Sequence, residues 1–200
     1  MTLTKNTDQL RIEVRDHLAA DALVRGNYWA NGKGCFIGCL THSNDPKIAF
    51  ERFGLPEPVM RIAENIFESL PDEEGRAFFA ALPDAVERDG KDLSRVHWAF
   101  LAAELRSLPP QSADVQAVID PVIQGMDVLA SGGAWGKDAA RAARAAAYAV
   151  ASATFDADSA ADAAADAAAQ AAAYAAHAAD ATDAVILRQR DTLLNFIKNA

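Results

Sequence analysis

The feature that most constrains the fold of this chain is an alanine-rich tract. From Ala134 to Ala184, 29 of the 51 residues are alanine. Alanine has the highest intrinsic helix propensity, so a tract of this length predicts helix. One unbroken helix over residues 134–198 would be about 97 Å long, which is too long for a compact domain. Asp156 and Ser159 are good N-cap residues, and they predict a turn near residues 154–159 between closely packed helices.

Amphipathic patterns predict further helices. Apolar residues recur at helical spacing over residues 8–24, 56–70, 93–108, 112–129 and 183–199, and shorter helices are expected from Pro46 to about Gly54 and from Pro71 to about Leu82. No segment alternates apolar and polar residues over a sustained stretch, so no sheet is expected. The predicted fold class is therefore all-α, a multi-helix bundle with close-packed alanine-rich C-terminal helices.

The sequence also predicts how the chain is divided. Residues 1–133 are expected to form an N-terminal helical region that contains a Gly-rich loop at 25–42. Residues 134–200 form the alanine-rich helical region. A chain of 200 residues can bury one sizeable core, so we expect the two regions to make one integrated domain.

The charge of the chain narrows the classes of partner. A net charge of −9 and a pI of about 4.8 leave no surplus of lysine and arginine to displace counterions from nucleic acid. An acidic surface instead suits a basic protein partner. The sequence lacks an uninterrupted apolar stretch of about 18 residues and a signal-peptide core, so neither a membrane span nor secretion is expected. The two cysteines are then expected as reduced thiols of a cytoplasmic protein.

The Gly-rich loop is the first candidate binding site. Consecutive glycine amides beside one lysine, as at Lys33 and Gly34, can form a nest that binds an anion. Tyr28 and Trp29 offer flat faces on which a base could stack. The loop is not a phosphate loop of the Walker type, because Cys35 follows Gly34 and no strand is predicted before it. The competing interpretation is a tight loop that Trp29 pins to the core.

Two thiols and a histidine form the second candidate. Cys35, Cys39 and His42 would share one face of a helix and could bind zinc, with His17 or His97 as a fourth ligand. The spacing is not a standard zinc pattern, and Gly38 weakens a helix there, so two buried thiols and a capping histidine are the competing interpretation. Lys33 could also depress the pKa of Cys35 and make it a nucleophile. No recognisable triad accompanies it.

Several segments resemble a group of uncharacterised proteins of phages and mobile elements. They are residues 28–42 (YWANGKGCFIGCLTH), 50–56 (FERFGLP), 66–71 (IFESLP) and 192–197 (TLLNFI). The alanine-rich half is similar to immunity proteins of bacterial toxin systems. The resemblance implies a setting of conflict between phage and host, and it brings no catalytic residues to this chain.

These observations lead to three hypotheses about function. The first is a non-enzymatic anti-defence protein that sequesters a small anionic nucleotide-type immune signal in the host cytoplasm, without a cofactor. The side chains expected to line its pocket are Tyr28, Trp29, Lys33, Gly34, His42, Arg141 and Arg144. The second is an acidic inhibitor or toxin-immunity protein that binds another protein, and the third is a cysteine- or zinc-dependent enzyme. The shallow faces of alanine-rich helices also predict a homodimer.

Overall fold

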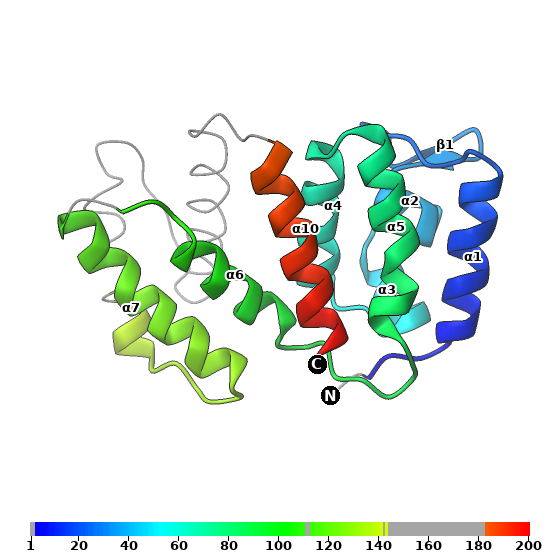
Figure 1. Ribbon diagram of the computed structural model, residues 1–200. Coiled ribbons are helices and arrows are strands. Elements are labelled where there is room, and N and C mark those ends of the chain that lie inside the picture. Colours follow the sequence, from blue (N-terminus) through cyan, green and yellow to red (C-terminus); the bar gives the residue numbers. More distant parts are fainter. Residues whose placement is uncertain (1–2, 111–112, 142, 144–182) are drawn as a thin grey trace. The chain divides into compact units, whose positions relative to one another are not determined.

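The computed structural model describes residues 3–110, 113–141, 143 and 183–200. Within these residues the fold is all-α, as predicted, apart from one small ribbon of two strands (Figure 1). The elements are α1 (Thr7–Ala19), β1 (Trp29–Ala30), β2 (Lys33–Gly34), α2 (Phe36–Thr41), α3 (Lys47–Phe53), α4 (Glu57–Ser69), α5 (Asp72–Val86), α6 (Val96–Arg106), α7 (Ala113–Ala130) and α10 (Asp183–Lys198). Most of the alanine-rich tract, with its predicted turn, lies outside the described residues.

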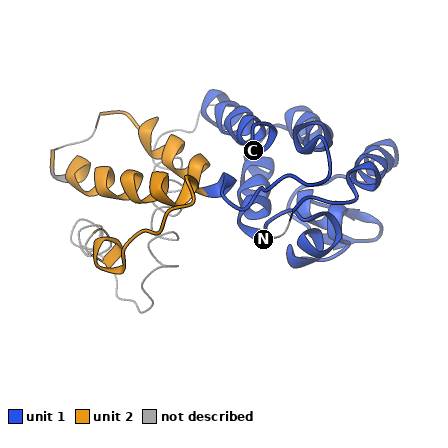
Figure 2. Cartoon of the chain, turned by 90° about the horizontal axis from the view of Figure 1, so that it is seen from below, with its two compact units in different colours: residues 1–97, 182–200 blue, residues 98–181 orange. Residues whose placement is uncertain are grey.

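The chain divides into two compact units (Figure 2). Unit 1 comprises residues 1–97 and 182–200, and unit 2 comprises residues 98–181. The C-terminal helix α10 therefore belongs with the N-terminal half of the chain. Because most of residues 134–182 lie outside the described part, the predicted division after residue 133 and the predicted integration of the two regions stay predictions.

The core of unit 1 is built around α5, which packs against α1 and α10, while α10 also contacts α4 (Figure 1). Phe36 lies at the centre of an aromatic cluster, with its ring centroid 5.0 Å from that of Phe78 and 5.2 Å from that of Phe79. All three side chains are buried. Helix α10 contributes Ile186, Leu193 and Ile197 to the core, so residues from both ends of the chain stabilise one apolar interior.

In unit 2, α7 continues past Pro121 and ends at Ala130, so its bounds are close to the predicted residues 112–129. Trp135 packs so closely on this helix that a Cβ atom added at Gly125 would lie 2.1 Å from its indole ring. An ion pair between Arg106 and Asp127 joins α6 to α7.

The N-terminal helix is shorter than predicted. We expected it to continue to Val24, but α1 ends at Ala19, and Asp21 has a positive φ of 51°. The following residues pair with the ribbon, since Val24 N donates to Gly34 O at 2.9 Å and Gly34 N donates to Ala22 O at 2.9 Å. These bonds to a distant strand residue replace the helical bonds that the apolar pattern suggested.

The prediction that the chain has no sheet is wrong. Trp29 pairs with Gly34, and Ala30 pairs with Lys33, in an antiparallel hairpin. Asn31 and Gly32 form its turn with φ values of 52° and 76°. An Asn-Gly pair is the most favourable sequence for a two-residue hairpin turn, because both residues must adopt positive φ. Strands of two residues are too short to show alternation, so only this dipeptide signals the hairpin.

Candidate functional site

The carbonyl group of Tyr28 packs closely against two glycines, Gly34 of β2 and Gly38 of α2. An added Cβ atom would lie 2.1 Å from the carbonyl oxygen of Tyr28 at Gly34, and 1.3 Å from the same oxygen at Gly38. Real side chains do not approach this closely, so only glycine allows the backbone of Tyr28 to lie there. The side chain of Tyr28 is 42% exposed. The Gly-rich loop is therefore a tightly packed turn that presents one aromatic ring outward.

The backbone amides of the loop are used within the protein. Gly34 N donates to Ala22 O, and Cys35 N donates to Asn27 O at 2.8 Å. Gly26 N donates to the Glu68 carboxylate, with 2.9 Å to Oε2. The Glu64 carboxylate accepts from Ile37 N at 2.9 Å, at the start of α2. The donor that the predicted anion nest requires at Gly34 thus already has a protein acceptor.

Trp29 and His42 meet in a cluster of three rings, here called the ring cluster, which also includes His17 of α1. The rings of Trp29 and His42 stack with centroids 4.2 Å apart, and His17 meets Trp29 edge-on at 5.7 Å. The Nε2 atoms of the two histidines are 3.1 Å apart. Burial, then the charges of His17 and Arg52, lower the pKa of His42. This cluster explains the place of Trp29 and His42 without a ligand.

Lys33 does not belong to the ring cluster and lies near a pocket instead. Its Nζ lies 3.9 Å from a carboxylate oxygen of Asp21, and Arg76 Nη1 donates to the same carboxylate at 2.8 Å. Asp21 and Arg76 both line a pocket of about 240 Å³, here called the arginine pocket. Its lining residues are Asp21, Leu23, Val24, Arg25, Phe67, Asp72, Gly75 and Arg76. Lys33 thus contacts Asp21, which lines the arginine pocket, but is not itself a lining residue.

The two arginines of this pocket are held by backbone carbonyls. Arg25 Nη1 donates to Leu70 O at 2.7 Å, and its other terminal nitrogen pairs with Asp72. Arg76 Nη2 donates to Leu18 O at 3.1 Å. With Lys33, three cationic side chains surround the two carboxylates of Asp21 and Asp72. The lining thus pairs two arginines with two aspartates, and Lys33 adds one further positive charge beside it.

Sequence reasoning did not single out the two arginines that line this pocket. Arg25 opens the Gly-rich loop, but nothing in its neighbourhood distinguishes it from a surface cation. Arg76 lies on α5, and the packing of α5 against α1 brings it to Asp21. No local spacing or motif could have indicated this pair.

Cys35, Cys39 and His42 do not come together as the zinc ligands that the sequence offered as an alternative, and they match the competing interpretation of two buried thiols and a histidine that caps α2. Both cysteine side chains are buried, and burial, as the largest cause, raises the pKa of each thiol to about 12. Cys39 Sγ lies 3.2 Å from Gly34 O, on the inner side of α2, whereas His42 belongs to the ring cluster. His17, a predicted fourth ligand, is also in that cluster.

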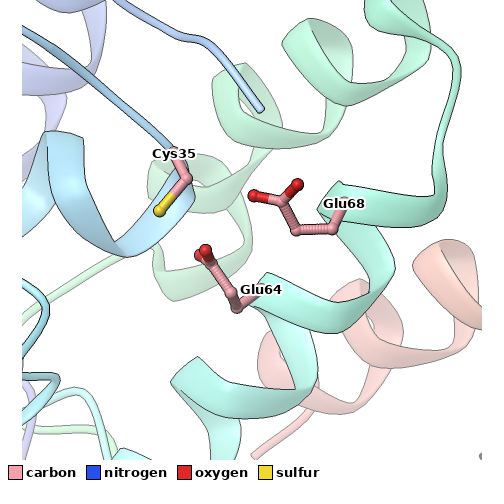
Figure 3. A group of neighbouring side chains, drawn as sticks. All are labelled: Cys35, Glu64 and Glu68. Atoms are coloured by element: carbon pink, nitrogen blue, oxygen red, sulfur yellow. The ribbon is translucent and has the colours of Figure 1, made fainter. Parts of the chain in front are cut away.

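Cys35 instead lies beside two carboxylates of α4. Its Sγ atom and one oxygen each of Glu64 and Glu68 all lie within 4.8 Å of one another (Figure 3). This is the one group of three or more potential metal ligands within the residues that the structure describes. Cys39 and His42 are not part of it. The sequence signal was weak, because Glu64 and Glu68 lie about 30 residues from the thiol.

Of the two arginines predicted from the alanine-rich region, Arg141 is among the described residues. Arg141 belongs to unit 2, is exposed, and forms an ion pair with Asp138 at 3.6 Å. Arg144 lies outside the described residues. Their predicted part in the pocket stays a prediction.

A second pocket, of about 410 Å³, lies within unit 2. Its lining residues are Leu105, Arg106, Leu108, Pro109, Pro110, Gln116, Asp120, Ile123, Gln124 and Asp127. Among its described lining residues the one cation is Arg106, which is paired with Asp127, and Asp120 adds a carboxylate that no lining cation balances. This lining does not suit an anion.

Among the described helices, none combines the length and the apolar character needed to cross a membrane. Comparison of the chain with models of protein families, with curated proteins and with solved structures gives no significant match.

Proposed function

We propose that the protein is a non-enzymatic binding protein that sequesters a small anionic ligand in the arginine pocket. The observation that carries this proposal is a cavity lined by Arg25 and Arg76, with Lys33 beside it through Asp21, in a protein whose net charge is −9. Guanidinium groups recognise phosphate and carboxylate oxygens through paired hydrogen bonds. The resemblance of residues 28–42 to phage and mobile-element proteins supports a nucleotide-type immune signal as the ligand.

The size of the pocket indicates which part of the ligand it holds. Its volume of about 240 Å³ is below the range of about 300–1,000 Å³ that is usual for drug-sized ligands. A phosphate group fits such a space, and the rest of a nucleotide would extend outside it. Because Leu18 O and Leu70 O already orient the two arginines, little side-chain entropy is lost on binding.

Several features favour binding over catalysis. Among the residues that the structure describes, those that line the arginine pocket include no histidine, cysteine or hydroxyl side chain, and each of the two aspartates there pairs with an arginine. Both thiols of the chain are buried, and a pKa of about 12 keeps them protonated near neutral pH. A protein that only sequesters its ligand needs oriented cations but no base or nucleophile.

The proposal is tested by offering the protein inorganic phosphate, pyrophosphate and linear and cyclic nucleotides. We expect at least one nucleotide to raise the melting temperature, and calorimetry to give one site per chain. Arg76→Gln removes a charged donor, which is worth about 1.5–3 kcal/mol, so the affinity should fall by about tenfold to a hundredfold. The bound nucleotide should be recovered chemically unchanged when the protein is denatured.

Arg15→Gln is the matched control. Arg15 lies on α1 and, like Arg76, pairs with an aspartate, Asp16. Its side chain is 72% exposed and does not line the pocket. This variant should bind as the wild type does. A panel that gives no thermal shift, or a nucleotide that binds Arg76→Gln with unchanged affinity, contradicts the proposal.

A second proposal, an acidic inhibitor or toxin-immunity protein, is supported by the net charge of −9. Binding to a basic protein partner would weaken as salt is added, and it would depend on exposed aspartates and glutamates. Lys33→Ala and Arg76→Gln would then leave protection against the toxin unchanged. The response of activity to these two variants separates the two proposals.

A further inference from the structure

We infer that Cys35, Glu64 and Glu68 form a binding site for one thiophilic divalent cation of the zinc and cadmium class. The inference rests on how the three side chains converge (Figure 3). Cys35 comes from the end of the hairpin, and the two glutamates lie one helical turn apart on α4. Their Sγ and carboxylate oxygen atoms lie within 4.8 Å of one another. In a tetrahedral zinc site the metal lies about 2.3 Å from sulfur and about 2.0–2.2 Å from oxygen, so small side-chain rotations suffice.

The two carboxylates give this cluster a negative charge that a bound cation would balance. Glu64 is 7% exposed and Cys35 is 1% exposed. Throughout the described residues, neither Glu64 nor Glu68 forms an ion pair with a lysine or arginine. The nearby basic side chains are engaged elsewhere, Arg25 with Asp72 and Arg61 with Glu57. The Cys35 thiol and the charge of Arg61 compensate Glu64 in part, but two carboxylates held this close together are costly away from water. A divalent cation removes that cost.

The carboxylates are also oriented as ligands. Glu64 accepts a hydrogen bond from Ile37 N, and Glu68 accepts one from Gly26 N. Such partners fix a carboxylate but leave other lone pairs for a metal, which is how outer-shell groups act at metal sites. The cation would join the Gly-rich loop to α4, and it would therefore stabilise the folded chain. This role is independent of the arginine pocket.

The chemistry of binding is an exchange of a proton for a metal ion. The Cys35 S–H bond breaks, its proton leaves to solvent, and the sulfur keeps the electron pair that forms the bond to the metal. No electron is transferred, so no oxidant or reductant is needed. Because a protonated thiol must lose its proton, affinity should rise by about tenfold for each pH unit from about pH 6 to about pH 8.

The test uses full-length protein, purified without metal and titrated with Cd²⁺ and with Zn²⁺. We expect one ion per chain, a rise in melting temperature with either ion, and the ultraviolet charge-transfer band of a cadmium–thiolate bond. Cys35→Ser should abolish the band. Glu64→Gln and Glu68→Gln should each weaken binding by about tenfold or more, since even the loss of an outer-shell group has an effect of that order.

Two variants serve as controls. Cys39→Ser removes the other buried thiol, and His42→Ala removes a histidine of the ring cluster; both should bind Cd²⁺ with the wild-type band. Circular dichroism of each metal-free variant checks folding, and Glu68→Gln, which changes a half-buried carboxylate, decides the question if Cys35→Ser does not fold. No band in the wild type, a band that survives Cys35→Ser, or unchanged affinity in Glu68→Gln overturns the inference.

Discussion

At the scale of single residues, the packing of the hairpin depends most on Gly38. Its neighbour is the carbonyl oxygen of Tyr28, which belongs to the backbone and cannot rotate away as a side chain would. A larger residue must therefore push the hairpin off α2, and the ring cluster and Cys35 would move with it.

We predict that Gly38→Ala destabilises the protein by about 3 kcal/mol or more, which is the upper end of the cost of overpacking. The added Cβ atom would lie 1.3 Å from Tyr28 O. Urea denaturation gives the free energy of unfolding. Gly136→Ala is the control, because its Cβ atom meets nothing within 4 Å. Similar destabilisation by both variants would show that close approach is not the cause.

A second prediction concerns His97 and acid. Burial lowers its pKa to about 4 in the folded protein, whereas an unfolded histidine titrates near 6.5. Between these values the unfolded chain binds the proton more readily. The contribution of the neutral ring is therefore complete above about pH 6.5 and is lost as the pH falls towards 4, by at most about 3 kcal/mol.

The measurement compares the wild type with His97→Gln, which cannot titrate. The difference between their free energies of unfolding should be constant above about pH 6.5 and should shift in favour of the variant below it. Other acidic groups affect both proteins alike and cancel in the difference. A difference that does not change with pH would contradict the half-buried, neutral state of His97.

At the scale of elements, a buried lysine holds the end of α10. Lys91 Nζ donates to Lys198 O at 2.7 Å and to Ile197 O at 3.0 Å. The last carbonyl groups of a helix lack partners within the helix and carry partial negative charge. The ammonium group satisfies them, and it also lies 3.7 Å from Glu87. This contact joins the C-terminal helix to the loop after α5.

We predict that Lys91→Met destabilises the protein by about 2–3 kcal/mol, because buried carbonyl groups lose a charged donor. Amide hydrogen exchange in the last turn of α10 should become faster. Lys198→Met, an exposed substitution at the same helix end, should change the free energy of unfolding by less than about 0.5 kcal/mol. Unaltered exchange in the Lys91 variant would contradict this account.

The elements also show what a sequence can predict. The bounds of α4, α7 and α10 follow from their apolar periodicity, which in α7 continues past Pro121. The end of α1 and the hairpin depend on pairing between residues 22–24 and Gly34, which periodicity does not encode. Only the Asn31-Gly32 dipeptide indicated the turn.

The candidate sites are less predictable than the helices. The loop sequence singled out Lys33 and Cys35. Lys33 lies beside the arginine pocket, and Cys35 belongs to the cluster with Glu64 and Glu68. Arg76, which shares Asp21 with Lys33, and Glu64, which lies beside Cys35, come from helices that reach these residues only through packing of the core. From the local sequence alone, a helix residue that faces solvent cannot be told from one that packs beside a buried thiol.

At the scale of the whole molecule, the order of elements in the chain differs from the order in which they pack. Unit 1 is interrupted by residues 98–181, and α10 completes it. The Arg190–Glu74 ion pair and the buried Ile186, Leu193 and Ile197 hold α10 on this unit. Unit 1 also contains the arginine pocket and the Cys35 cluster. The alanine-rich tract is therefore an insertion as far as unit 1 is concerned.

We predict that unit 1 folds without residues 98–181. A flexible Gly/Ser linker of about 20 residues, with a root-mean-square span of about 25 Å, would replace them. This variant should unfold cooperatively and keep the ligand and metal affinities of the full chain. Residues 1–97 alone should not, because loss of α10 exposes the apolar faces of α4 and α5 that it covers. If the linked variant is unfolded, or if residues 1–97 fold alone, α10 and the inserted unit have other roles in folding than the packing of unit 1 implies.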